Sequence, residues 1–392
     1  MSLSAASAGA LIAALGVALP TPEQTLLLRA CLCDGADARD AWKRWVETVG
    51  DPKAAMAGDR GSVKRLLPLL YFALRRGDAD VDPALAPYLR LAYLREQMRS
   101  TTYLRICGDV LGALEQASVD AILLRGAALA ATVYDDPALR HCHDIALLVA
   151  PDDVERAADA LLGAGLERVT LHGEEGGMAA LLRHETALPV ELHTRLFSAA
   201  LYELPLDELQ GRSVEVRIGG ATAHVLSPAD ALVHVCGHAS YSESRASLRW
   251  IGDAWLLIDR NTDLDWDQVL QTTERSRLAL PMLVALRYLT LELSARVPAT
   301  LLARLEARAR ESTPIERDVA LHGARLGAAT DTGSLLREMP GGLAVRGRVA
   351  AWLLFPSRAY VSDVLQARGP MAQLACYASR PVDYLRRRWA AR

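Results

Sequence analysis

Two carboxylates in strand-length apolar runs could hold divalent metal ions. Asp144 directly precedes the run 145–149, and Glu191 lies inside the run 188–193. Carboxylates at positions i and i+2 of a strand face one side, and a third from a neighbouring strand completes a two-metal site for phosphoryl or nucleotidyl transfer. Here the i+2 position is Ala146, and a methyl group cannot coordinate a metal. The sequence therefore has the first and third of these carboxylates.

A turn suited to phosphate binding precedes these carboxylates. The apolar run 121–124 ends in Arg125, and Gly126 and Ala127 begin an Ala-rich segment with helical spacing. Gly126 permits close backbone approach, and the free N–H groups at a helix start can receive a phosphate. Signatures of other nucleotide or hydrolase sites, such as GxxxxGK[ST], GxGxxG and GxSxG, do not occur.

Histidines offer a competing metal site. His141, His143 and His193, together with Asp144, could form the zinc or manganese site of a hydrolase, although the usual helical His spacing is missing. A pair four residues apart on one predicted helix, His234 and His238, has ligand spacing but is more typical of core or groove lining.

A charged pair on a later predicted helix also has two interpretations. Arg249 and Asp253 are four residues apart, which suits an ordinary ion pair on one helix face. They could instead line a cleft that faces the carboxylates.

The elements that must position these residues change character along the chain. Residues 22–118 show helical spacing, the region from about 121 to 226 has short apolar runs with turn signals, and the chain after Ser227 is helical again. The predicted strands are 121–124, 145–149, 168–171, 188–193 and a hairpin across Gly219 and Gly220. We predict an α+β fold with three parts: an N-terminal helical region (1–118), a small mixed-sheet α/β core (119–226) and a C-terminal helical domain (227–392).

Composition limits the function classes. The 392 residues are 51% hydrophobic and 23% charged with a net charge of -3, which argues against binding of long nucleic acid. The six cysteines form no CxxC pair, so we expect free thiols in a cytoplasmic protein. The apolar run Ala5–Leu19 is shorter than the roughly 20 residues of a membrane span, so we expect a helix there and no membrane insertion.

The order and spacing of these motifs resemble the uncharacterised nucleotidyltransferase-like family of bacteria, a branch of the polymerase-beta-type nucleotidyltransferase superfamily. That family has a Lys-Gly before a helix, an Arg ahead of Asp-Ile-Asp-Leu-Leu-Val, and a later Glu-Leu-His. Here the matching segments are Arg125-Gly126, Arg140 through Val149, and Glu191 through His193. Further stretches also resemble the sequence pattern of this family, namely Leu226–His238, Leu248–Asp253 and Leu354–Ser357.

The resemblance implies a role for each matching residue. Asp144 and Glu191 would bind Mg²⁺ or Mn²⁺, and Asp144, Glu191 and the position of Ala146 would form the catalytic centre. Nucleotide binding would involve Arg125, Gly126, Ala127 and Arg140, and a cleft would be lined by His193, His238, Arg249 and Asp253.

The expected reaction is transfer of a nucleoside monophosphate from a nucleoside triphosphate to an acceptor hydroxyl or phosphate, with release of pyrophosphate. By resemblance, the acceptor is a modified peptide of a natural-product pathway such as that of lasso peptides, a sugar phosphate or another small molecule. Ala146 predicts impaired turnover, whether it is natural or an engineered inactivation. The alternative is a catalytically inactive nucleotide-binding or scaffold protein.

Overall fold

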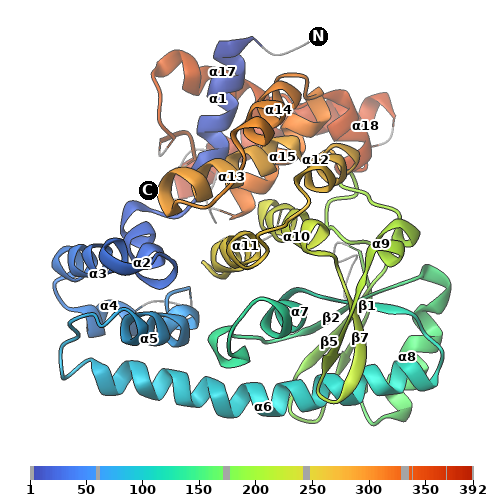
Figure 1. The fold of residues 1–392 in the computed structure, drawn as a ribbon. Helices are drawn as coiled ribbons and strands as arrows, with labels where there is room; N and C mark the ends of the chain where they lie inside the picture. Colours follow the sequence, from blue (N-terminus) through green and yellow to red (C-terminus); the bar gives the residue numbers. More distant parts are fainter. Residues whose placement is uncertain are drawn as a thin grey trace.

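The computed structural model describes residues 4–58, 62–170, 177–241, 248–327, 335–337, 339–367 and 369–390. The last residue of the predicted strand 168–171 lies outside these ranges. The described chain is mostly helical, with a seven-stranded mixed sheet in the middle and helices at both ends (Figure 1). The predicted α+β class is therefore confirmed.

The strands account for a short central part of the chain. They are β1 (Ala121–Leu124), β2 (Ile145–Val149), β3 (Glu167–Val169), β4 (Met178–Arg183), β5 (Pro189–His193), β6 (Val214–Ile218) and β7 (Ala221–Val225). The helices before and among them are α1 (Ala5–Gly16), α2 (Pro22–Leu32), α3 (Gly35–Val49), α4 (Pro52–Gly58), α5 (Leu67–Arg76), α6 (Ala86–Gln116), α7 (Arg125–Thr132), α8 (Val154–Gly163) and α9 (Leu206–Arg212).

After β7, the described chain consists of helices and the segments that connect them, without a further strand. The helices are α10 (Pro228–Ser240), α11 (Arg249–Arg260), α12 (Trp266–Arg275), α13 (Ala279–Leu293), α14 (Ala299–Arg310), α15 (Pro314–Gly327), α17 (Leu343–Leu354) and α18 (Pro370–Ala390). Short helical turns of other types lie at Lys64–Leu66, Pro137–Leu139, Pro151–Asp153 and Tyr360–Val364. The predicted start of α10 is confirmed, because the Ser227 side chain caps it and Pro228 occupies its first turn.

The sheet has the strand order β3-β4-β5-β2-β1-β7-β6. Its centre is mixed, since β2 runs antiparallel to β1 but parallel to β5, and β1 runs parallel to β7. The predicted hairpin is formed by β6 and β7. Two elements were not predicted from the sequence, namely β4, which pairs with β5, and the short helix α9.

The two faces of the sheet pack into different cores. One core joins alternate residues of β2 and β5, such as Ile145, Leu147 and Val190, to helices α6 and α8. The other joins Ala146 and Leu148 to residues of α10 and α11. We call this second face, which also carries Glu191 and His193, the site face. Figure 1 shows α6 running below the sheet and α10 and α11 above it.

Helices from the two ends of the chain pack together above the site face. Helix α1 contacts α13, α15 and α17, and α2 contacts α11 and α13. The division into three regions at residues 118 and 226 stays a prediction. Among the described residues, none of the helices combines the length and apolar character needed to span a membrane.

Candidate functional site

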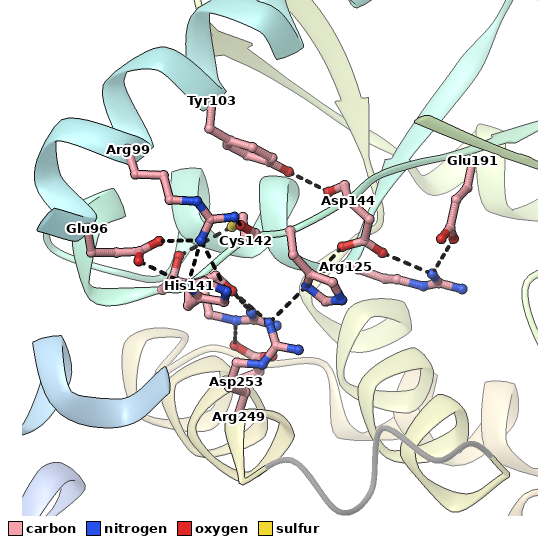
Figure 2. A network of polar contacts seen from close by, with 12 residues as sticks. Glu96, Arg99, Tyr103, Arg125, His141, Cys142, Asp144, Glu191, Arg249 and Asp253 are labelled. Carbon is pink, nitrogen blue, oxygen red and sulfur yellow. Dashed lines mark hydrogen bonds and ion pairs between the residues drawn. The ribbon is translucent and has the colours of Figure 1, made fainter. Parts of the chain in front are cut away.

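The predicted carboxylates come together on the site face. Strands β2 and β5 are neighbours in parallel register, and Ala146 lies opposite Glu191. Asp144 directly precedes β2, so strand alternation places it on the same side as Ala146. Figure 2 shows Asp144 and Glu191 pointing toward one guanidinium, that of Arg125.

Arg125 forms ion pairs with both carboxylates. Its Nη1 lies 2.7 Å from Glu191 Oε2 and 3.3 Å from Asp144 Oδ2. The residue begins α7 with a φ of 56°, in the left-handed region that a non-glycine residue adopts only at a cost. Burial would raise the pKa of Asp144, but His143, Arg125 and Arg249 together hold it below its ordinary value.

His193 supports the second carboxylate. Its Nε2 lies 2.9 Å from Glu191 Oε2, and the imidazole is buried, which lowers its pKa. Burial acts on Glu191 in the opposite direction and would raise its pKa, but the hydrogen bond with His193 and the charge of Arg125 leave that pKa below its ordinary value. Glu191 is therefore ionised and Arg125 is its counterion.

The predicted nucleotide-binding turn is tightly packed. Gly126 and Ala127 are buried at the start of α7. A Cβ on Gly126 would lie 3.1 Å from Cys142 Sγ and 3.5 Å from Arg140 Nη1. Glycine at this position therefore lets the turn approach the segment that leads to Asp144.

Arg140 is committed to a buried ion pair. It donates from Nε and Nη2 to the two oxygens of Asp253 on α11, each at 2.7 Å, and Tyr134 donates to the same carboxylate at 2.8 Å. Burial would lower the pKa of Arg140, but Asp253 outweighs this and holds it above its ordinary value. Arg140 thus joins the loop before β2 to α11 and positions that loop.

Arg249 faces the same loop from α11. Its Nη1 donates to the carbonyl oxygen of His141 at 2.7 Å and lies 3.3 Å from His143 Nδ1. Burial, with the charges of Arg140 and Arg65, lowers the pKa of Arg249 to about 10. Burial is the largest cause of this shift, and the two neighbouring arginine charges add to it.

Helix α6 contributes residues that sequence reasoning missed. Tyr103 donates to the carbonyl oxygen of Asp144 at 2.8 Å, and Arg99 Nη2 donates to that of Cys142 at 2.7 Å. Glu96 lies 2.9 Å from the His141 ring. Figure 2 shows these side chains reaching from α6 to the loop. Their spacing along α6 puts polar residues on one helix face, which is the sequence signal that could have found them.

The histidines of the predicted hydrolase site, His141, His143 and His193, do not form a metal site with Asp144 among the described residues. His141 interacts with Glu96 and Arg99, whereas His193 interacts with Glu191. Across the residues that the structure describes, no group of three or more His, Cys, Asp or Glu side chains is placed to hold a metal ion. The zinc or manganese hydrolase interpretation has no support there.

His234 and His238 lie on α10, above the site face. Burial lowers the pKa of His234 to about 3 and that of His238 well below its ordinary value, and the charge of Arg125 adds to both shifts. Within the described chain, His234 Nε2 and His238 Nδ1 are buried without a hydrogen-bond partner. Both rings are therefore neutral.

A divalent metal shared by Asp144 and Glu191 does not fit this arrangement. Magnesium requires oxygen ligands in near-octahedral geometry. The position between the two carboxylates is taken by the Arg125 guanidinium, and the third position offers the Ala146 methyl group. The residues present thus hold an organic cation where a two-metal site would hold an ion.

Comparison with known proteins gives one match. A family model described as an uncharacterised nucleotidyltransferase matches residues 61–294, which is more than half of the 392 residues and spans α5 to α13. Every predicted site residue falls inside this range. Searches of the curated proteins and of the solved structures found no match.

Proposed function

Because this chain belongs to the uncharacterised nucleotidyltransferase family, we propose that its site face binds a nucleoside triphosphate between the sheet and helices α10 and α11. In this reaction class an acceptor oxygen bonds to the α-phosphorus, and the bond from that phosphorus to the bridging oxygen breaks. Pyrophosphate leaves with the electron pair of that bond, and the proton of an acceptor hydroxyl passes to water. We further propose that this chain performs the transfer poorly.

The observation that carries the proposal is the pairing of β2 with β5. It brings Asp144 and Glu191, 47 positions apart in the sequence (191 minus 144), onto one face beside the turn that starts α7. That turn presents backbone N–H groups, which suit a phosphate. Arg249 adds a buried cation beside Asp144, since its charge lowers the pKa of that carboxyl.

A cavity lies beside the loop before β2, on the α6 side of the sheet. This cavity of about 360 Å³ is lined by residues of α6, the loop before β2 and the loop before β5, namely Arg99, Thr102, Tyr103, Ile106, His143 and 186–189. Small-molecule sites typically have about 300–1,000 Å³. Because it opens on the α6 side and not between the sheet and helices α10 and α11, this cavity suits the acceptor better than the nucleotide.

The impairment follows from Ala146. Two-metal catalysis needs carboxylates that bridge the ions, and the ions neutralise the charge of the leaving pyrophosphate. A methyl group beside Glu191 removes one such ligand. The bound nucleotide is therefore held but not efficiently transferred.

The proposed acceptor is a small or peptidic molecule that carries a hydroxyl or phosphate. The net charge of -3 gives no broad basic surface for a nucleic-acid backbone. A modified peptide of a natural-product pathway or a sugar phosphate fits this description.

One observation favours a second candidate, a nucleotide-binding protein without catalysis. Arg125 is shared by both carboxylates and offsets one of their two negative charges, so the site is partly neutralised without the ions that the reaction uses. The double variant Arg125→Lys/Ala146→Asp separates the two candidates. Pyrophosphate release by this variant with Mg²⁺ and a candidate acceptor supports an impaired enzyme, whereas unchanged binding without turnover supports the second candidate.

Binding to the site face is tested by a matched pair of substitutions on α11. Arg249→Met removes the cation beside Asp144, whereas Arg260→Met removes one that pairs with Asp135 at 2.7 Å on the surface. A fluorescent nucleoside triphosphate analogue should bind Arg249→Met at least about tenfold more weakly than the wild type. Equal losses in both variants would reject the proposed location.

A further inference from the structure

The two site carboxylates share a cation that belongs to the chain itself. We propose that Arg125 supplies, as part of the protein, the positive charge that divalent metal ions supply in two-metal nucleotidyl transfer, so that the phosphates of a nucleoside triphosphate bind this site without a metal. The inference rests on the proposed function, because it takes the site face as the nucleotide site. It adds that binding is independent of Mg²⁺.

The position of the guanidinium is the first support. One nitrogen, Arg125 Nη1, contacts Glu191 at 2.7 Å and Asp144 at 3.3 Å, so a single positive group bridges carboxylates from two different segments. The three side chains are only 11–21% exposed, and at such burial an ion pair is screened little by salt. A metal ion would have to displace this group to reach both carboxylates.

The chain holds Arg125 in place at a conformational cost. Its φ of 56° is unfavourable for a residue with a side chain, and it is the first residue of α7, directly after β1. The cost is offset by the two ion pairs that this backbone geometry permits. Strain of this kind persists only where the surrounding structure fixes the conformation of the residue, and it is concentrated at functional sites.

The residue opposite Glu191 matches this arrangement. With a carboxylate at position 146, Arg125 would face three negative groups, and the excess negative charge that repels phosphates would be larger by one. With Ala146, which is 1% exposed, one guanidinium meets only two carboxylates, each held ionised by its neighbours. Ala146 and Arg125 therefore act together to reduce the negative charge of the site without a metal.

Arg125 also keeps a donor for a ligand. A guanidinium has five N–H donors, and the contacts to both carboxylates use only Nη1. Among the described residues, Arg125 Nε is buried and has no hydrogen-bond partner. A buried donor without an acceptor is costly, and a phosphate oxygen is the acceptor that arginine binds best.

The experiment measures nucleotide binding with and without divalent metal. Calorimetric titration of the wild-type chain with each of the four common nucleoside triphosphates should give, for the one that binds, dissociation constants in EDTA and in Mg²⁺ that agree within about threefold. Arg125→Gln should weaken binding in EDTA at least about tenfold. Its control is Arg105→Gln on α6, which removes an exposed arginine paired with Asp109 and should leave binding unchanged.

A second measurement does not depend on the stability of any variant. Titration of the wild-type chain with Mn²⁺ alone, followed by electron paramagnetic resonance, should show no stoichiometric binding. Tight binding of one or more Mn²⁺ ions, which the variant Glu191→Gln abolishes, would overturn the inference.

The outcomes separate the two proposals. Binding of a nucleoside triphosphate only with Mg²⁺ overturns the role of Arg125 and leaves the proposed function intact. Binding in EDTA that Arg125→Gln weakens supports both. No binding under either condition rejects the proposed function, and the inference with it.

Discussion

Ala146 on β2 and Glu191 on β5 are register partners on adjacent parallel strands, so a methyl group stands beside the glutamate on the site face. Asp144, two residues before Ala146, shares the Arg125 guanidinium with that glutamate. The side chain at position 146 thus bears on the charge of the whole site. It leaves two carboxylates and one internal cation where two-metal transfer uses three carboxylates and two ions.

Ala146→Asp should make the stability of the chain depend on metal. The position is 1% exposed, so in EDTA the added charge should lower the free energy of unfolding by about 3–5 kcal/mol. Mn²⁺, which the third carboxylate would help to displace the Arg125 guanidinium, should restore part of this loss in urea denaturation. Ala146→Asn, of the same size but uncharged, is the control, and an equal response of both variants to Mn²⁺ would contradict the account.

The buried pair of Arg140 and Asp253 should be far more costly to break than a surface pair. Arg140→Met leaves a carboxylate that is 3% exposed without its counterion, so we expect a loss of about 3–5 kcal/mol by urea denaturation. Arg140→Met/Asp253→Leu should recover most of it. Arg105→Ala, which breaks an exposed pair, should cost less than about 1 kcal/mol. A similar loss for both single variants would show that the buried pair is not special.

Acidification should destabilise the fold before the carboxylates titrate. Burial lowers the pKa of His234 to about 3, from an ordinary 6.5, so between these values the unfolded chain binds more protons than the folded one. Stability is then lost as the pH falls below about 6.5, by about 1.4 kcal/mol per pH unit for this histidine. His143, whose pKa is lowered to about 4, adds to the same trend over the range above that value.

The test is urea denaturation of the wild type and of His234→Gln at several pH values between about 7.5 and 5.5. Toward the acidic end of this range, the variant should show a slope with pH that is shallower by up to about 1.4 kcal/mol per unit. His224→Gln, at an exposed position on β7, is the control. Identical slopes for His234→Gln and the wild type would show that His234 is not the buried group described here.

Gly126→Ala should destabilise the turn before α7 through one contact. The new Cβ would lie 3.1 Å from Cys142 Sγ, so we expect a cost of about 1–3 kcal/mol. Cys142→Ala removes that sulfur, and the double variant should therefore lose less stability than the sum of the single variants. Strict additivity in thermal unfolding would place the cause elsewhere.

Much of the sheet could be predicted because its signals are local. The apolar runs 121–124 and 145–149 are β1 and β2 with the same bounds, and the glycine pair 219–220 joins β6 to β7. Strand β4 could not be predicted in the same way, because Met178–Arg183 (Met-Ala-Ala-Leu-Leu-Arg) consists mostly of good helix formers without strand alternation and gains its register from β3 and β5.

The sequence offered many members of the candidate site, but it missed the α6 residues Glu96, Arg99 and Tyr103 and the pairings between side chains. The sequence offers Arg249 as a partner for Asp253 four residues away, whereas the structure pairs Asp253 with Arg140, 113 residues away. Likewise, the family resemblance implied Arg125 in nucleotide binding, but not its position between Asp144 and Glu191. Local spacing carries no information about contacts made by the packing of α11 or α6 against the loop before β2.

The central claim is that the site face binds a nucleotide, and thermal unfolding with added ligand tests it most directly. The wild-type chain would be heated with each of the four common nucleoside triphosphates, in EDTA and in Mg²⁺, alongside Arg249→Met. A ligand that binds only the folded state raises the midpoint according to its concentration relative to its dissociation constant. We predict a rise for at least one triphosphate in the wild type that is reduced in Arg249→Met. No rise with any triphosphate under either condition would contradict the claim.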